Sequence, residues 1–475
     1  MPEAMAKAMF WEGPCTPSDR VAVIDEHGHQ ISYADLFAKV DAAATHLQSM
    51  PPRQLGLLFT SNTLSSLVAY LACLQARHVP LLLPAGMTPE LAAALQAHYQ
   101  PDWVIGAHLE GPLLAGTQWP IVRRIVQPIA GAGTSPRPAC DLAPELGLLL
   151  STSGSTGSPK LVRLSYGNLQ ANAESIAQYL SLTADERALT VLPPHYSYGL
   201  SVIHSHLHAG ASLVLRDVSV LTPAFADTIR ACGVTSISGV PYIYQMLWRT
   251  AFHKQDLPSL RTLTQAGGRL DDKLTKAWSQ VADERGWRFF CMYGQTEATA
   301  RISHVPPQRL ADKVGSIGIA IPGGRLEIDP QNSELIYTGP NVMLGYATCR
   351  EDLALGDEQH GVLRTGDVAR QDEDGFFYIT GRLKRFIKLA GNRIGLDEVE
   401  HQLQQEVALP VMAAGQDERL VLWLEATDEA LVDQTRQWLA KRFGIHHSLC
   451  RIRLVDSLPL LSSGKKDYSA MLADS

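Results

Sequence analysis

The chain lacks a long apolar run, a paired-cysteine motif and a block of basic residues. No apolar stretch approaches the roughly 20 residues that a helix needs to cross a bilayer, so we expect no membrane span. The seven cysteines are scattered and include no Cys-x-x-Cys pair, which argues against a disulfide framework or a zinc site and fits a reducing cytosol. A net charge of −7 without a basic block argues against nucleic-acid binding. Residues 1–16 contain no long apolar segment, so we expect no signal peptide and a cytoplasmic location.

The chain does contain alternating strand-like and helix-like segments. Its 475 residues are 45% hydrophobic and 19% charged, as in a globular protein of two or three domains. Strands are predicted at Leu55–Thr60 and His78–Leu83, and helices at Ile31–Met50 and Leu64–Ala76. This alternation favours an α/β layered fold with substantial parallel pairing. Later predicted elements are helices at Tyr166–Leu180, Asp397–Gln404 and Glu429–Lys441, and strands at Ala188–Leu192, Ser212–Leu215, Thr235–Gly239, Glu334–Tyr337, Phe376–Ile379, Arg419–Glu425 and Arg451–Val455.

The segment Ser151–Lys160 is the most informative in the chain. It reads Ser-Thr-Ser-Gly-Ser-Thr-Gly-Ser-Pro-Lys and follows the apolar run 146–150, a predicted buried strand. Glycines let backbone N–H groups approach phosphate oxygens, hydroxyls donate hydrogen bonds, and a lysine adds positive charge. The segment is not a Walker A loop, because the Gly-Lys-Ser/Thr ending is missing. We interpret it as a polyphosphate-binding loop rather than a Ser/Gly linker, since it lies between a predicted buried strand and a predicted helix.

Further motifs follow this loop in a fixed order. They are Tyr-Gly-Gln-Thr-Glu at 293–297, Gly-Pro-Asn-Val-Met-Leu-Gly-Tyr at 339–346, Thr-Gly-Asp at 365–367, Gly-Arg at 381–382 and Gly-Lys at 464–465. Together with the loop, they resemble the adenylate-forming superfamily, which includes acyl-CoA synthetases, aryl-acid ligases, luciferase and the adenylation domains of peptide synthetases. The resemblance implies a large N-terminal α/β core of several subdomains at 1–383, with a small β-rich subdomain. It also implies a small mobile α+β C-terminal domain at 384–475, with a hinge at Lys384.

The resemblance implies an ATP-dependent ligation of an acid to a thiol. A carboxylate attacks the α-phosphate of ATP, pyrophosphate leaves, and the acyl-adenylate then reacts with the thiol. Because the first step brings anions together, positive charge and hydrogen-bond donors are needed around its transition state. The residues that the resemblance assigns to the β- and γ-phosphates are Thr152, Ser153, Ser155, Thr156 and Lys160.

Other motif residues receive roles around the nucleotide. Glu297 would coordinate Mg²⁺, a cation that takes a carboxylate plus phosphate oxygens, and Thr296 would donate to the α-phosphate. Tyr293 would stack on adenine, with Gly267 and Gly268 on the other side of the base. The alternative for Glu297 is an acid at the N-terminus of a helix that follows the Tyr-Gly turn.

The last motifs would complete the nucleotide site and prepare the second step. Asp367 would accept hydrogen bonds from both ribose hydroxyls, with Arg382 nearby, and Lys465 would bridge the substrate carboxylate and the ribose–phosphate oxygens. After adenylation the small domain would rotate about Lys384, and Gly391 would admit the pantetheine arm. The alternatives are an ordinary turn residue at 367, a solvated lysine pair at 465–466 and a solvated basic face formed by Lys384, Arg385 and Lys388.

The acid pocket is expected around the run 194–201. The candidate lining residues are His195, Tyr196, Ser197, Tyr198, Gly199 and Val240, and His195 is a candidate gate. Relatives that activate amino acids carry an aspartate where this chain has Gly199, so an α-amino group would lack a partner here. The run 196–200 is more similar to that of aryl-CoA ligases, which favours aromatic or medium aliphatic acids. The spacing of His195, His204, His206 and His208 does not suit a metal site, so we interpret most of them as packing or surface residues.

The thiol acceptor is either coenzyme A or the phosphopantetheine of a separate acyl carrier protein. Coenzyme A is favoured by its frequency in the family. An Asp-Ser-Leu triplet at 456–458 mimics a pantetheine attachment site, but a carrier domain does not fit around it. Two other classes stay open: an inactive adenylate-binding relative with a regulatory or scaffolding role, and a luciferase-like oxidase. Carboxylate-dependent exchange between ATP and pyrophosphate, followed by thiol or oxygen consumption, distinguishes them.

Overall fold

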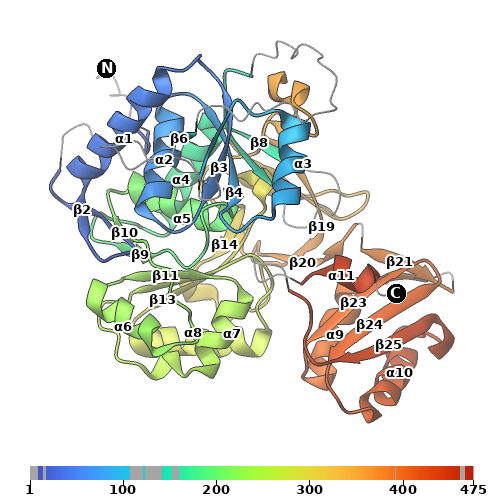
Figure 1. The fold of residues 1–475 in the computed structure, drawn as a ribbon. Coiled ribbons are helices and arrows are strands. Elements are labelled where there is room, and N and C mark those ends of the chain that lie inside the picture. Colours follow the sequence, from blue (N-terminus) through green and yellow to red (C-terminus); the bar gives the residue numbers. More distant parts are fainter. Residues whose placement is uncertain are drawn as a thin grey trace. The chain divides into compact units, whose positions relative to one another are not determined.

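The computed structural model describes residues 9–13, 18–106, 121–122, 142–151, 160–383, 385–390, 392–460 and 466–473. The chain divides into two compact units (Figure 1). The first consists of Met1–Val314, Ala320–Arg325 and Thr338–Leu363, and the second of Gly315–Ile319, Leu326–Tyr337 and Arg364–Ser475. A division of the chain at 383/384 stays a prediction.

The larger sheet of the first unit is mostly parallel. Its strand order is β15-β14-β13-β12-β11-β9-β10-β1-β2, and the strands from β13 to β1 run parallel to their neighbours. Parallel strands end at a common edge of a sheet, where α/β proteins build their ligand sites. The strands are β1 (Val21–Ile24), β2 (Gln30–Ser32), β9 (Arg187–Leu189), β10 (Ser212–Val214), β11 (Ser236–Gly239), β12 (Thr262–Gln265), β13 (Arg288–Tyr293), β14 (Ser303–Val305) and β15 (Ile319–Ala320).

The second sheet of this unit has the order β18-β8-β7-β4-β3-β5-β6. All six residues of β3 (Leu55–Thr60) are buried, as in a strand covered on both faces, and this strand matches its prediction. The other strands are β4 (Val79–Pro84), β5 (Trp103–Ile105), β6 (Ile121–Val122), β7 (Leu146–Ser151), β8 (Leu161–Ser165) and β18 (Gly345–Ala347).

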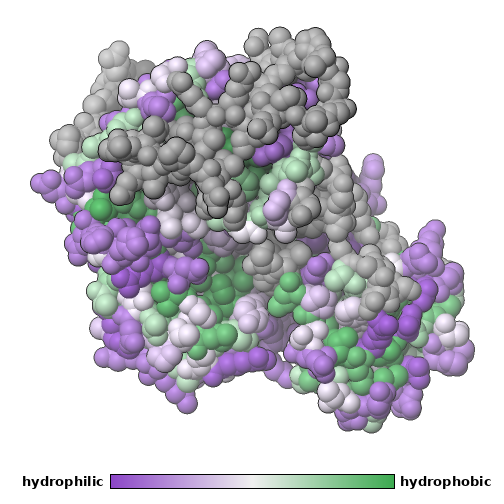
Figure 2. All heavy atoms as spheres, in the orientation of Figure 1, coloured by the Kyte–Doolittle hydropathy of each residue, from purple (hydrophilic) through white to green (hydrophobic). Residues whose placement is uncertain are grey.

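Helices connect and cover these strands. The predicted helix at 31–50 is α1 (Tyr33–Gln48). Its predicted start was wrong, because Ile31 belongs to β2 and Ser32 caps the helix by accepting a hydrogen bond from the Asp35 amide. In α8 (Asp272–Arg285) the buried residues repeat at helical spacing. Polar side chains gather on the outer surface over α6 and α8 (Figure 2). The remaining helices of this unit are α2 (Leu64–Gln75), α3 (Pro89–Tyr99), α4 (Tyr166–Tyr179), α5 (Ser197–His208), α6 (Pro223–Cys232) and α7 (Pro241–Arg249).

The second unit contains a four-stranded sheet and an α+β region. The sheet has the order β16-β17-β19-β20, formed by Arg325–Ile328, Glu334–Thr338, Val362–Gln371 and Phe377–Arg382. In the α+β region, β24 (Arg419–Glu425) pairs antiparallel with β23 (Val411–Gln416) and parallel with β25 (Cys450–Val455). The other elements are the hairpin strands β21 (Phe386–Leu389) and β22 (Asn392–Gly395) and the helices α9 (Leu396–Val407), α10 (Ala430–Phe443) and α11 (Tyr468–Ala473).

In the described portion of the chain, Cys73, Cys232, Cys291, Cys349 and Cys450 are free thiols. No helix among the residues placed by the structure is long and apolar enough to cross a membrane.

Candidate active site

Four residues predicted to line the acid or adenine sites lie at the carboxyl edge of the large sheet. Val240 follows β11, Gly267 follows β12, and Tyr196 precedes α5. A Cβ atom on Gly267 would lie 2.6 Å from the Tyr196 Oη and 3.0 Å from the Val240 Cγ1, and Gly267 has a φ of +84°. Both the close approach and the left-handed backbone require glycine here. Gly268 lies beside them, against Pro241.

The Tyr-Gly-Gln-Thr-Glu motif forms a tight turn after β13. A Cβ atom on Gly294 would lie 1.8 Å from the carbonyl oxygen of Ala300, so the turn folds back on itself in a way that only glycine allows. Gln295 Nε2 donates to the Tyr293 hydroxyl at 2.9 Å. The hydroxyl oxygens of Thr296 and Ser197 are 3.1 Å apart, which joins this turn to the start of α5.

Tyr346 connects the end of the predicted phosphate loop to Glu297. Its hydroxyl donates to Glu297 Oε1 at 2.9 Å, and Lys160 Nζ lies 3.3 Å from the centre of its ring. Burial, together with the Glu297 carboxylate, raises the pKa of Tyr346, so the hydroxyl stays a donor at neutral pH. One tyrosine thus contacts a lysine through its ring and a carboxylate through its hydroxyl. No role was predicted for Tyr346, although it ends the 339–346 motif.

Asn341 joins the 339–346 motif to the segment that follows the 293–297 motif by hydrogen bonds. This residue is buried, and its Nδ2 donates to the carbonyl oxygens of Ala298 and Arg301, both at 2.8 Å. Thr299 Oγ1 donates back to the Asn341 carbonyl at 2.7 Å. The backbone amide of Met343 also donates to the Glu297 carbonyl at 2.9 Å. The two motifs therefore form one hydrogen-bonded structure.

Arg301 is a buried cation beside the predicted acid pocket, and no sequence motif marks it. It is 1% exposed, and its guanidinium carbon lies 3.9 Å from the centre of the Tyr198 ring. Its Nε has no hydrogen-bond partner within the described part of the chain. The hydroxyl of Tyr198 donates to the Thr264 carbonyl at 2.8 Å, so Tyr198 supports the wall of the site. Positive charge at this place opposes a cationic substrate group.

Gly199 has no room for a side chain. A Cβ atom there would lie 2.4 Å from the Pro193 carbonyl oxygen and 2.8 Å from that of Leu192. A carboxylate at this position would require the backbone to move. His195 is half-buried, and burial lowers its pKa to about 4, so the ring is neutral at pH 7.

The histidines of α5 take part in packing, as predicted for most of them. His204 is 2% exposed and its Nε2 lies 2.8 Å from the Tyr70 hydroxyl, while His206 is 3% exposed with Nδ1 2.8 Å from the Val202 carbonyl. His208 is half-buried near Gln170. Within the described residues, no group of three or more His, Cys, Asp or Glu side chains is arranged to hold a metal ion.

These buried histidines predict acid sensitivity. Burial lowers the pKa of His204 from 6.5 to about 3. Below pH 6.5 the unfolded chain therefore binds more protons than the folded protein, so the free energy of unfolding decreases as the pH falls from 6.5 toward 3. The expected loss is up to about 1.4 kcal/mol per pH unit from this residue. Denaturant unfolding at pH 7 and pH 5 should therefore show a shallower pH dependence in His204→Gln, which keeps a partner for Tyr70. The matched exposed variant His46→Gln should keep the wild-type slope, and an unchanged slope in His204→Gln would contradict the assignment.

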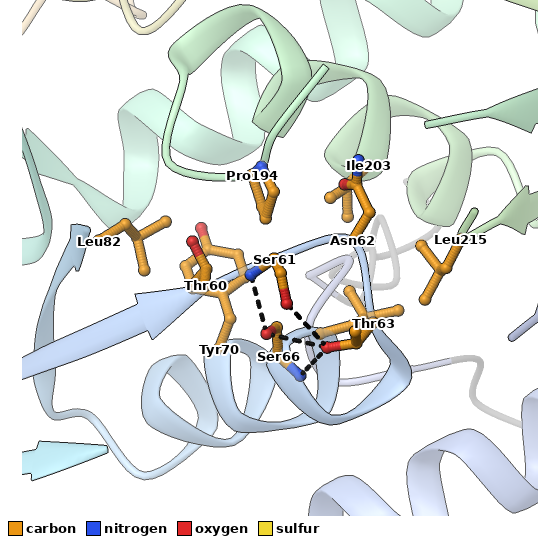
Figure 3. Close-up of a pocket in the computed structure, with 11 residues that line it drawn as sticks. Thr60, Ser61, Asn62, Thr63, Ser66, Tyr70, Leu82, Pro194, Ile203 and Leu215 are labelled. Atoms are coloured by element: carbon orange, nitrogen blue, oxygen red, sulfur yellow. Dashed lines mark hydrogen bonds between the residues drawn. The ribbon is translucent and has the colours of Figure 1, made fainter. Parts of the chain in front are cut away.

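A small cavity lies at the carboxyl end of β3 and the start of α2 (Figure 3). Its volume of about 10 Å³ is room for about one water molecule, and it is too small for an organic acid. The Ser61 amide donates to Ser66 Oγ at 3.1 Å along its wall, and Pro194 and Ile203 face it from the other side (Figure 3). We therefore exclude this cavity as the substrate pocket.

In the second unit, the two predicted ribose residues are neighbours. Asp367 on β19 is directly opposite Arg382 on β20, and Arg382 Nε donates to Asp367 Oδ1 at 3.0 Å. The Asp367 side chain is 3% exposed, whereas that of Arg382 is 62% exposed. The exposed guanidinium of Arg382 therefore pairs with an almost fully buried carboxylate. Thr152, Ser153, Ser155, Thr156, Lys384, Gly391 and Lys465 lie outside the described residues.

Comparison with known proteins identifies the class. Solved structures with the same fold include the Bacillus subtilis o-succinylbenzoate CoA synthetase in complex with its acyl-adenylate intermediate, with a TM-score of 0.75, 22% identity and 95% of each chain covered. ATP-bound MatB from Rhodopseudomonas palustris also has a TM-score of 0.75, with 22% identity, 98% of this chain and 97% of that chain covered. The predicted α/β fold is confirmed, and it is that of adenylate-forming enzymes.

The AMP-binding enzyme model matches residues 10–347, and the chain belongs to this family of adenylate-forming acid ligases. A feruloyl-CoA synthase from Amycolatopsis is 31% identical over 342 residues, 67% of each protein. The 2-succinylbenzoate–CoA ligase of Bacillus pumilus is 32% identical over 261 residues, 53% of this chain and 52% of that protein. The peptide synthetase CmlP of Streptomyces venezuelae is 29% identical over 474 residues, 94% of this chain but 47% of CmlP.

Proposed function

We propose that this chain converts an aromatic or medium aliphatic carboxylic acid to its acyl-adenylate and transfers the acyl group to a thiol, with coenzyme A as the favoured acceptor. The observation that carries the proposal is the Lys160–Tyr346–Glu297 arrangement. It joins the end of a hydroxyl-rich loop to a carboxylate at the edge where α/β proteins bind ligands. Lys160 would neutralise phosphate charge as pyrophosphate leaves.

The donor set fits Mg²⁺ bound together with a nucleotide. Mg²⁺ keeps several waters and binds through one or two carboxylates plus substrate phosphates, so it does not need a protein cage. Glu297 would hold the ion, and Tyr346 would orient the carboxylate through its hydrogen bond to Oε1. When bound, the ion would offset the negative charge of the phosphates. Thr296, fixed by Ser197, would donate to the α-phosphate.

The remaining nucleotide contacts are proposed from the motifs. Tyr293 would stack on adenine, with Gly267 and Gly268 leaving space for the flat base. Asp367 would accept hydrogen bonds from the ribose hydroxyls, with Arg382 as an additional donor. Among the residues outside the described part, Thr152, Ser153, Ser155 and Thr156 would hold the phosphates, and Lys465 would contact the carboxylate during adenylation.

The charge of the pocket supports an acid without an α-amino group. The backbone around Gly199 excludes the carboxylate that would pair with an ammonium, and the run from Arg187 to Arg216 contains no acidic residue. Arg301 adds a buried positive charge next to Tyr198. An ammonium group here would lose its water without gaining a partner. Tyr196 and Val240 supply apolar and aromatic surface for the acid.

The acceptor and the domain movement are proposed from the family. One relative is named a feruloyl-CoA synthase and another an L-proline ligase that loads a carrier protein, so both kinds of acceptor occur among similar proteins. A carrier protein is therefore the alternative acceptor. We propose that a C-terminal domain at 384–475 turns about Lys384 between the two steps, with Gly391 admitting the pantetheine arm.

A panel of acids tests the substrate assignment. Pyrophosphate exchange into ATP should be fastest with benzoates or medium-chain fatty acids and slow with α-amino acids, and the best acid should then consume coenzyme A. Fastest exchange with an amino acid would contradict the pocket assignment. Exchange without coenzyme A consumption would favour the carrier protein, and oxygen consumption would favour an oxidase. A protein that binds ATP but shows no exchange would be a regulatory or scaffolding relative.

A further inference from the structure

Glu400 is the centre of a buried charge cluster in the second unit. It lies on α9 and is 7% exposed. Its Oε2 accepts from the Ala413 amide and from Arg385 Nη2, each at 3.1 Å, and its two carboxylate oxygens accept from the Tyr468 hydroxyl at 3.0 and 3.1 Å. Lys466 Nζ forms an ion pair with Oε1. Two cations and two further donors thus compensate one buried carboxylate, as burial of a charge requires.

Lys466 is fixed on both its side chain and its backbone. Its Nζ also donates to the Val411 carbonyl at 2.6 Å, on the first residue of β23. Its backbone forms an antiparallel bridge with Leu460, and the next amide, Asp467, donates to the Pro459 carbonyl at 2.9 Å. Lys466 is therefore not a solvated lysine. It is anchored to α9 and β23 directly after Lys465 in the chain.

Arg385, which lies before β21, is held by the same carboxylate. Its guanidinium carbon lies 3.9 Å from the centre of the Tyr468 ring, its Nε is 3.0 Å from Asp397 Oδ1, and Nη2 donates to the Ala413 carbonyl at 2.7 Å. Arg385 directly follows Lys384. One carboxylate thus ties the residue after the proposed hinge to the residue after the proposed adenylation lysine.

We propose that Glu400 is a positioning residue for the adenylation step, acting through Lys466, and this role rests on the proposed function of Lys465. A lysine on a flexible stem can stabilise a transition state only if its backbone is held in place, and small misplacements are costly. The Glu400–Lys466 pair supplies that restraint. Through the same carboxylate, Lys466 is linked to Arg385, the residue after the proposed hinge.

The two half-reactions separate this role from a merely structural one. Lys466→Met keeps an unbranched chain one atom shorter than lysine and removes the ion pair and the bond to Val411, and we expect it to slow ATP–pyrophosphate exchange by about 10- to 100-fold. Thioester formation from supplied acyl-adenylate should stay within about 2-fold, because Lys465 is needed only for adenylation. The probe is the benzoate or fatty acid that gives the fastest exchange with the wild-type protein. Lys466→Arg should recover exchange, and the exposed Lys441→Met on α10 is the matched control.

Each outcome of these assays bears on the positioning role. Equal loss of both half-reactions in Lys466→Met, or no loss in either, would overturn the positioning role while leaving the proposed function intact. A normal exchange rate in Lys465→Ala would contradict the proposed function itself, and the positioning role with it. A double variant, Lys465→Ala with Lys466→Met, should be no slower in exchange than Lys465→Ala alone, since both act through one side chain. If Lys466→Met does not fold, Tyr468→Phe should show a smaller loss that is still confined to ATP–pyrophosphate exchange. An equal effect of Tyr468→Phe on both half-reactions would overturn the positioning role of Glu400.

Discussion

Substitution Lys465→Ala is expected to slow acyl-adenylate formation by about 100-fold or more, as removal of a single charge-stabilising donor does in other enzymes. Lys465 would contact the carboxylate and the phosphate only while negative charge is transferred between them. Thioester formation from supplied acyl-adenylate should stay largely intact, because that step does not need this contact. Single-turnover assays of each half-reaction measure the two rates separately.

The control for this substitution is Lys441→Ala, which removes a lysine from the exposed surface of α10. Both half-reactions should be unchanged in that variant. Equal loss of both half-reactions in Lys465→Ala would contradict the model in which the C-terminal domain presents different residues in the two steps.

Substitution Glu297→Gln is expected to lower exchange by about 100-fold at saturating acid and to raise the Mg²⁺ concentration needed for half-maximal rate. The amide oxygen of the new side chain can still accept from Tyr346, so the local structure should be kept. The lost property is the negative charge that would hold the ion. A Mg²⁺ titration of the exchange rate measures both effects.

Tyr346→Phe separates charge from orientation at this site. It removes the hydrogen bond to Glu297 but keeps the carboxylate and the ring beneath Lys160, so a smaller loss of about 10-fold is expected. Glu284→Gln, an exposed acid on α8, is the matched control for Glu297→Gln. A Glu297→Gln protein with wild-type Mg²⁺ dependence would show that this carboxylate does not hold the ion.

The fold was predictable where local pattern determines it. The apolar run of β3 predicted a buried strand, and β24 has the predicted bounds 419–425, because a strand with buried faces leaves a continuous signal. The start of α1 was missed because Ser32 is both a strand end and a helix cap, and apolar periodicity does not record caps.

The candidate site residues that were predictable are those that belong to sequence motifs. Glycine at 267 and 294 is explained by close contacts that no pattern displays, although Gly294 belongs to a motif and Gly267 had a predicted place beside adenine. The roles of Tyr346 and Arg301 could not be read from the sequence. Tyr346 meets a carboxylate 49 positions away, and Arg301 looks like an ordinary surface cation until the fold buries it.

Long-range charge pairs were the hardest feature to predict. Lys466 and Glu400 are 66 positions apart, and a lysine pair near the end of a chain is usually solvated. Only the packing of α9 against β23 brings the two charges together. The choice of Lys465 over Lys466 as the adenylation residue was made from motif position, and the engagement of Lys466 with Glu400 supports it.

The most direct test of the proposed adenylation activity is carboxylate-dependent exchange of labelled pyrophosphate into ATP by the purified protein. We expect exchange that requires both an organic acid and Mg²⁺. The exchange rate should fall sharply in Glu297→Gln and in Lys465→Ala. Folded protein that shows no exchange with any benzoate, fatty acid or amino acid, or exchange that is unaffected by both substitutions, would contradict it.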